Sequence, residues 1–198
     1  MDIDVILFDG FDELDAIAPF EVLRNAEAFG ADLHPVLAGL HGPGEYEGAH
    51  GTRVRVDRGI SGTAGLLIVP GGGWNSRSPR GARAEVARGD LPRLLAREHA
   101  RGTVVASVCT GGMVLAAAGI TTGRRATTHH LALDELRESG ADVVDARVVD
   151  DGDVLTAGGV TSGIDLALWI VERHAGAELA ERVAAEIEHE RTVEVLRT

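Results

Sequence analysis

The sequence is short of several residue types, and each shortage narrows its possible roles. It has one cysteine, Cys109, in 198 residues, so no internal disulfide can form, and we expect a reducing, cytoplasmic location. No apolar run reaches the length needed to span a membrane. The first residues also lack the basic start and long apolar core of a signal peptide. We therefore expect no membrane partner.

Positive charge is also scarce. Lysine is absent, and 19 arginines face 31 acidic residues, which gives a formal net charge of −12 at pH 7. A nucleic-acid surface needs a basic stripe, so we expect no nucleic-acid partner. With 44% hydrophobic and 25% charged residues, the composition is that of a soluble globular protein. Residues 1–198 suit a single domain with a substantial core.

Apolar runs and helical patterns alternate along the chain. We predict strands at residues 3–8, 33–40, 52–56, 66–70, 104–108, 143–149 and 154–156, with a hairpin turn at 150–153. We predict helices at 15–29, 82–101 and 113–118, one ending near 140, one at 162–174 with Ser162 as its N-cap, and one at 179–196. Continuous apolar strands alternating with helices indicate a doubly wound, flavodoxin-like α/β fold, whose mainly parallel sheet has helices on both faces.

Cys109 lies in the shortest of these connections. Cys-Thr-Gly-Gly at 109–112 leaves almost no loop between a buried strand and a helix, so the cysteine is expected at a strained nucleophile elbow. The first helical amides and the helix dipole would favour its thiolate. The alternative is that a lone cysteine among apolar residues is buried and inert. The tight strand–cysteine–glycine–helix turn favours the nucleophile.

Three glycine-containing turns follow predicted strands, at 9–10, 70–73 and 109–112. In a parallel sheet these turns meet at the carboxyl ends of the strands, where ligands bind. The glycines at 71–73 lack the spacing of a nucleotide-binding loop, and their amides suit an oxyanion hole better. The histidines show no metal-ligand spacing, so we expect neither a cofactor nor a metal. Trp74 is either a wall of this pocket or an exposed aromatic.

Five blocks of sequence carry a resemblance to a known family. They are residues 14–22, 67–73, 108–116, 126–130 and 156–169, and together they span almost the whole chain. The sequence resembles the DJ-1/PfpI superfamily, which has the class I glutamine-amidotransferase-like fold. The last block is typical of the branch that holds the isonitrile hydratases and the sensor domains of AraC-type regulators.

The resemblance implies roles for Cys109 and for one acidic residue, Asp15. Cys109 matches the nucleophilic elbow cysteine, and Asp15 matches the acidic residue that approaches the thiol. A carboxyl held there would have its pKa raised by burial and by the like charge, which suits a general acid. The residue pattern alone also allows Asp15 to be a helix N-cap, and the two roles are compatible.

Other positions complete the implied site. The amides of Gly72 and Thr110 match the oxyanion hole, and Gly73 adjoins it. Protease-like members have a histidine where this chain has Thr110, so the proteolytic interpretation loses its base. Thr110 instead matches the residue after the cysteine in the isonitrile hydratase branch, which implies a catalytic role in which its hydroxyl orients substrate or water. His129 matches a histidine near the thiol, or is an ordinary hydrogen-bonded residue at a helix start. His130 and the segment 16–18 depart from the hydratase pattern, which leaves the substrate open.

The resemblance predicts an isonitrile hydratase-like lyase that needs no cofactor. The Cys109 thiolate would attack the terminal carbon of a small isonitrile, Asp15 would supply and remove protons, and a covalent thioimidate would be hydrated to an N-substituted formamide. The alternatives are a glyoxalase-like or deglycase-like enzyme acting on α-oxoaldehydes, and a redox or ligand sensor without turnover. Members of the superfamily are usually dimers, so we expect a homodimer, with the first and last helices as candidate contacts.

Overall fold

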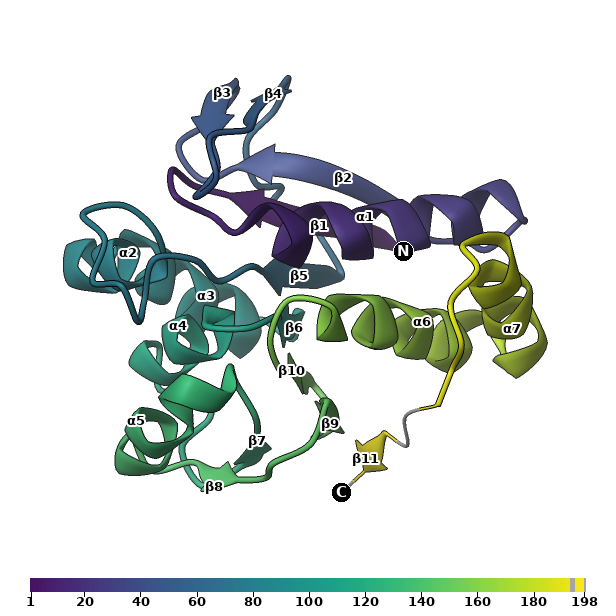
Figure 1. The fold of residues 1–198 in the computed structure, drawn as a ribbon. Helices are drawn as coiled ribbons and strands as arrows, with labels where there is room; N and C mark the ends of the chain where they lie inside the picture. Colours follow the sequence, from purple (N-terminus) through teal and green to yellow (C-terminus); the bar gives the residue numbers. More distant parts are fainter. Residues whose placement is uncertain (193–194, 198) are drawn as a thin grey trace.

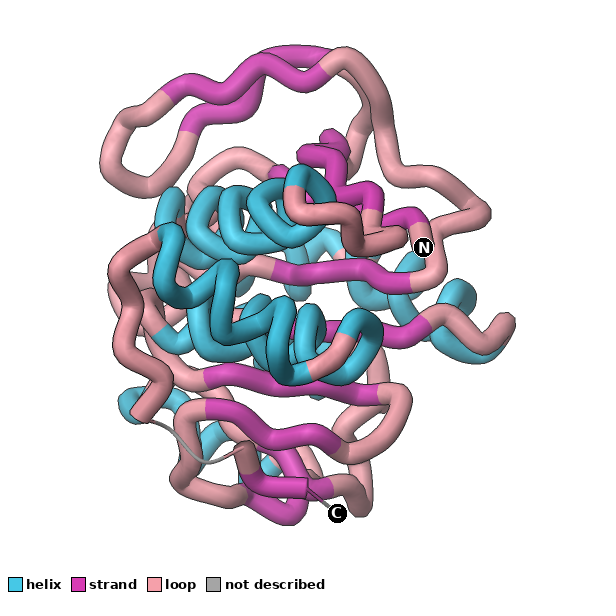
Figure 2. The backbone as a smooth tube through the Cα atoms, turned by 90° about the vertical axis from the view of Figure 1, so that its right-hand side faces the viewer, coloured by secondary structure: helices cyan, strands magenta, loops and turns pink. Residues whose placement is uncertain are grey.

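The computed structural model describes residues 1–192 and 195–197, which form one layered α/β unit (Figures 1 and 2). Within this part, a central sheet of seven strands has the order β11-β9-β10-β6-β5-β1-β2. Every neighbouring pair is parallel except β9 and β10. The strands are β1 (Asp2–Leu7), β2 (His34–Gly39), β5 (Leu66–Val69), β6 (Val104–Ser107), β9 (Val148–Asp150), β10 (Val154–Ala157) and β11 (Leu196–Arg197). The predicted mainly parallel sheet is confirmed.

Helices cover both faces of the sheet (Figure 1). One face carries α1 (Glu13–Ala28), α6 (Ser162–Ala175) and α7 (Ala177–Glu186), which lie in front of the strands in Figure 2. The other face carries α2 (Ala82–Arg88), α3 (Asp90–Ala100) and α4 (Gly111–Ala117), with η1 (His130–Ala132) and α5 (Leu133–Glu138) beyond α4. Because both faces are covered, β5 and β10 are buried at every residue, as their continuous apolar sequences predict.

Two small strand pairs lie outside the main sheet. β3 (Gly44–Glu47) and β4 (Arg53–Val56) form an antiparallel hairpin, and β7 (Arg125–Ala126) pairs with β8 (Asp142–Val143). The strand predicted at 143–149 is therefore divided between β8 and β9. The predicted hairpin around 150–153 is confirmed by the antiparallel pairing of β9 with β10.

Three predicted helix features are wrong. The single helix at 82–101 is broken at Gly89, whose φ of +80° ends α2 in the left-handed conformation. The N-cap of α6 is Thr161 rather than Ser162. The last helix stops at Glu186, and Glu188 has a φ of +52°, so the chain turns back and β11 pairs with β9. Apolar periodicity continues past the breaks at Gly89 and Glu188, because these breaks are set by the local backbone geometry.

None of the helices in the described part of the chain is long and apolar enough to cross a membrane.

Candidate active site

The backbone at Cys109 forms the expected strained elbow between β6 and α4. Its φ is +56°, a conformation that non-glycine residues rarely adopt. The amide donates to the carbonyls of Ala157 (3.1 Å) and Gly158 (2.7 Å), at the end of β10. The Thr128 hydroxyl donates to the Cys109 carbonyl at 2.8 Å. These contacts hold the turn in place, with the cysteine only 6% exposed.

Asp15 lies in the first turn of α1 and is completely buried. The N-cap of this helix is Asp12, whose carboxylate accepts from the Leu14 amide at 3.2 Å, so the N-cap interpretation of Asp15 is wrong. Instead, Oδ2 of Asp15 accepts from the Gly71 amide at 3.0 Å. Its Oδ1 is buried without a hydrogen-bond partner among the described residues. Asp15 is therefore a buried carboxyl that is short of donors.

This environment changes the protonation of Asp15. Burial, with a further contribution from the negative charge of Asp12, raises the pKa of Asp15 to about 7. The Gly71 and Val160 amides and the nearby Cys109 thiol each lower the pKa and so oppose part of this rise. A carboxyl with a pKa near neutrality can both accept and return a proton, which is the property of a general acid–base.

The pKa of the Cys109 thiol is raised, whereas the sequence predicts that it is lowered. Burial, together with the negative charge of Asp15, raises the pKa of Cys109 to about 12. The amides of Thr110 and Val160 lower the pKa but do not compensate, and α4 has only seven residues, so its dipole is small. The predicted resting thiolate is therefore wrong. The thiol has to lose its proton as it attacks, and Asp15 is the adjacent acceptor.

The glycine turn after β5 contacts both Thr110 and Asp15 through its amides. The Gly72 amide donates to the Thr110 hydroxyl at 3.1 Å, so in this state it is not open to a ligand. Gly71 lies in the predicted glycine turn, but its contact with Asp15 was not predicted: its amide donates to the Asp15 carboxylate. A Cβ at Gly71 would lie 2.5 Å from the amide nitrogen and hydroxyl of Thr110, so this close approach requires glycine. Gly73 lines the hollow above the thiol.

Val160 is a second residue that the sequence did not indicate. It lies between β10 and α6 with a φ of +45°, an unusual conformation for a β-branched residue. Its amide lowers the pKa of both the Cys109 thiol and the Asp15 carboxyl. Because the group involved belongs to the backbone, the valine side chain gave no chemical signal.

A hollow of about 230 Å³ opens over Cys109 at the carboxyl edge of the sheet. Trp74 forms part of its wall and is only 6% exposed, which answers the question left open by the sequence. The Trp74 indole donates to Glu135 at 3.1 Å, and the Arg83 guanidinium lies 4.3 Å from the ring centroid. These contacts from α2 and α5 fix the orientation of the ring.

His129 also lines this hollow. Its Nδ1 accepts from the Leu131 amide at 3.2 Å, so it caps η1, and its ring lies 4.3 Å from that of His130. Burial lowers the pKa of His129, with His130 contributing, so the ring is neutral at pH 7. With Nδ1 accepting, the proton is on Nε2. His129 therefore has the structural role of a cap and also a place beside the thiol.

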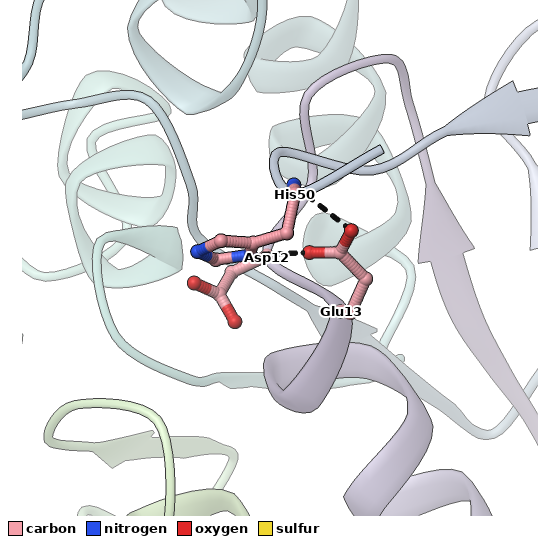
Figure 3. Close-up of side chains that lie close together, drawn as sticks. All are labelled: Asp12, Glu13 and His50. Carbon is pink, nitrogen blue, oxygen red and sulfur yellow. Dashed lines mark hydrogen bonds and ion pairs between the residues drawn. The ribbon is translucent and has the colours of Figure 1, made fainter. Parts of the chain in front are cut away.

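Asp12, Glu13 and His50 are the described residues close enough together to hold a metal ion, with ligand atoms within 4.8 Å of one another (Figure 3). Glu13 already accepts from the His50 amide (2.9 Å), the His50 Nδ1 (2.7 Å) and the Thr52 amide (3.2 Å). These bonds tie the β3–β4 connection to α1, which gives Glu13 a structural role.

Comparisons with known proteins agree with this architecture. The DJ-1/PfpI family model matches residues 1–173. The chain is 45% identical to an isonitrile hydratase from Pseudomonas putida, in an alignment spanning 46% of this chain and 40% of that enzyme. It is 27% identical to a deglycase from Thermococcus kodakarensis, over 89% of this chain and 92% of the relative. The crystal structure of Drosophila melanogaster DJ-1beta superposes with a TM-score of 0.81 and 25% identity, covering 96% of this chain and 98% of that one.

Proposed function

Because the chain belongs to the DJ-1/PfpI family, whose members similar to it include enzymes, we propose that it hydrates isonitriles to N-substituted formamides. The observation that carries the proposal is the buried Asp15 carboxyl, with a pKa of about 7, beside the thiol of an elbow cysteine. The identity with an isonitrile hydratase supports this reaction among those open to the site.

In the first step, Cys109 adds to the isonitrile. The Asp15 carboxylate takes the thiol proton as the sulfur forms a bond to the terminal carbon of R–N≡C. Asp15 then returns this proton to the same carbon, which gives the covalent thioimidate R–N=CH–S. The amides of Thr110 and Val160, which lower the pKa of the thiol, stabilise negative charge on the sulfur as the proton leaves.

In the second step, water releases the product. Asp15 takes a proton from water as the water oxygen bonds to the thioimidate carbon, and it passes this proton to the imidate nitrogen. The carbon–sulfur bond then breaks, the remaining hydroxyl proton passes through Asp15 to the sulfur, and R–NH–CHO leaves. We propose that the Thr110 hydroxyl, which accepts from Gly72 and keeps its own hydrogen free, orients the water, with the Nε2–H of His129 beside it.

The proposal is tested by incubating the purified protein with small isonitriles and measuring formamide by NMR. We expect formamide from the wild-type chain and none from Cys109→Ala or Asp15→Asn, with circular dichroism showing that both variants stay folded. Full activity in either variant would rule out the mechanism.

A second candidate is an enzyme that acts on α-oxoaldehydes. The similarity to a deglycase covers nearly the whole chain and favours it. The thiol would add to the aldehyde carbon to give a hemithioacetal, with Asp15 again moving the proton. Lactate formed from methylglyoxal by the wild-type protein, but not by Cys109→Ala, together with a blank isonitrile assay, would select this function.

The raised pKa of Cys109 bears on the sensor alternative as well. The thiolate is the form that peroxide oxidises, and a thiol with a pKa of about 12 is almost wholly protonated at pH 7. This argues against redox sensing. Unmodified Cys109 after mild peroxide treatment, measured by mass spectrometry, is the expected result.

We also propose that the protein acts in the cytoplasm as a homodimer. Among the described residues, two large apolar side chains are exposed, Leu14 at 51% on α1 and Leu131 at 65% in η1. Leu14 adjoins Asp15, so an α1-mediated contact would lie near the site. Light scattering gives the mass in solution, and a Leu14→Glu variant that stays dimeric would place the contact elsewhere.

A further inference from the structure

Asp12 occupies a position that its helix-capping role does not require. It begins α1 as the N-cap, and its amide donates to the Gly71 carbonyl at 2.9 Å. Asp12 also lines the hollow over Cys109, and its negative charge acts on the thiol. In Figure 3 the Asp12 carboxylate lies beside the His50 ring. The main chain thus fixes a negative charge close to the thiol.

A second hollow of about 290 Å³ adjoins the first, because Asp12, Gly73 and Ser76 line both. Its other side chains include His50 and Arg80, so it is polar, and a hydrophobic substituent would gain little there. An electrophile bound at Cys109 has to pass Asp12 to place the rest of its structure in this second space.

The first hollow has a negative charge from Asp12, whereas the positive charge in the second hollow is paired with an acid. His129 is neutral, and Asp12 is the fixed ionic side chain among the described residues that line the first hollow. In the second hollow, the positive charge of Arg80 is paired with Glu47 at 3.0 Å. The charge of Asp12 raises the pKa of Asp15, Cys109, His129 and His50, so its negative potential extends over the site.

We propose that Asp12 is a specificity-determining residue that excludes anionic electrophiles from Cys109 and admits neutral or cationic ones, whose polar remainder occupies the second hollow. The negative charge of Asp12 repels an anionic electrophile strongly when both lie in the same partly buried hollow. Such repulsion discriminates between substrates of equal size. The inference rests on the proposed function only in requiring that small electrophiles reach Cys109. It does not depend on the reaction that follows.

The test uses Cys109 as its own probe, since it is the only cysteine in the chain. Iodoacetamide is neutral and iodoacetate is anionic, and in both cases the sulfur forms a bond to carbon while iodide leaves. The rate of each is measured by mass spectrometry and divided by the rate with N-acetylcysteine. The ratio of the two normalised rates cancels the fraction of thiolate, so it reports charge discrimination alone.

The variant Asp12→Asn removes the charge and keeps an equally good helix cap. Asp32→Asn is the matched control, because it removes one charge from a residue before the amino end of β2, at the opposite edge of the sheet. We expect the wild-type protein to prefer iodoacetamide by about tenfold more than the free thiol does. Asp12→Asn should lose most of this preference, and Asp32→Asn should keep it.

Two outcomes would overturn the proposal. One is a wild-type ratio equal to that of N-acetylcysteine, and the other is an unchanged ratio in Asp12→Asn. Alkylation requires no turnover, so the result stands even if no isonitrile is hydrated. A preference for iodoacetamide without formamide production would reject the proposed function and keep the role of Asp12.

Discussion

Asp15 and Asp165 are two buried aspartates in the first turns of neighbouring helices, α1 and α6, and the fold treats them in opposite ways. Asp165 accepts from Nε and Nη2 of Arg147 at 2.8 and 2.6 Å, and its Oδ1 lies 2.9 Å from Nε2 of His189. Asp15 has an amide on one oxygen and no hydrogen-bond partner on the other among the described residues.

The difference separates a structural carboxylate from one available for chemistry. The partners of Asp165 connect α6 to the residue that precedes β9 and to the segment after α7. Among the described residues no cation pairs with Asp15, so burial makes its charged form costly and raises its pKa to about 7. A buried acid that is left short of partners is therefore a better marker of the site than burial alone.

The largest expected effect is on catalytic activity, which should fall when Asp15 is replaced and not when Asp165 is replaced. Asp15→Asn should lower formamide production by about a thousandfold or more, because the thiol then lacks a proton acceptor. Asp165→Asn should stay within about threefold of wild type, because neither Asp165 nor its partners Arg147 and His189 line the hollow over Cys109. Steady-state rates with one isonitrile decide this. Equal losses in both variants would mean that Asp15 acts only through the fold.

The pH dependence of stability should also identify Asp15. Its folded pKa of about 7 exceeds its ordinary 3.8, so the folded state holds this proton more tightly than the unfolded state does. Its contribution to stability is therefore complete below about pH 4 and is lost as the pH rises through 7. Between pH 5 and 8, the wild-type protein should lose about 2–3 kcal/mol relative to Asp15→Asn, measured by urea unfolding. A pH-independent difference would contradict the raised pKa.

Asp165→Asn should destabilise the fold by roughly 2 kcal/mol at pH 7, because Arg147 and His189 lose a charged partner. The loss is moderate since the Arg147 side chain is 41% exposed and stays partly hydrated. Urea unfolding gives the value, with the exposed ion pair of Asp134 and Arg137 as the control, where Asp134→Asn should change stability by less than about 0.5 kcal/mol. Equal effects at both positions would deny Asp165 its structural role.

Much of the fold follows from the sequence. Continuous apolar strands, helical patterns and tight glycine turns were enough to predict a parallel sheet covered on both faces and a strained elbow at Cys109. The ends of the helices were harder to predict, because the break at Gly89 and the turn at Glu188 each depend on the backbone conformation of a single residue. Periodicity does not record such local geometry.

The site was predictable where a side chain carries the chemistry and not where the backbone does. Cys109 and Asp15 match a family motif, but the amides of Gly71 and Val160 are contributed by residues of no distinctive type. The raised pKa of the thiol was also out of reach, because it depends on how deeply Cys109 is buried and how near Asp15 lies. Those are properties of the folded chain.

The smallest predicted effect links Asp12 to the contrast between the two buried aspartates. If Asp15 must be ionised to take the thiol proton, kcat/KM should rise with pH along a limb centred near 7. Asp12→Asn removes a like charge that raises this pKa, so the limb should move to lower pH by about half a unit. Neutral His129, with its pKa lowered by burial, does not supply a limb at this pH. The test compares the pH profiles of kcat/KM for wild type, Asp12→Asn and Asp32→Asn. A shift of the same size in Asp32→Asn would mean that the net charge of the protein, rather than the position of Asp12, sets the protonation of Asp15.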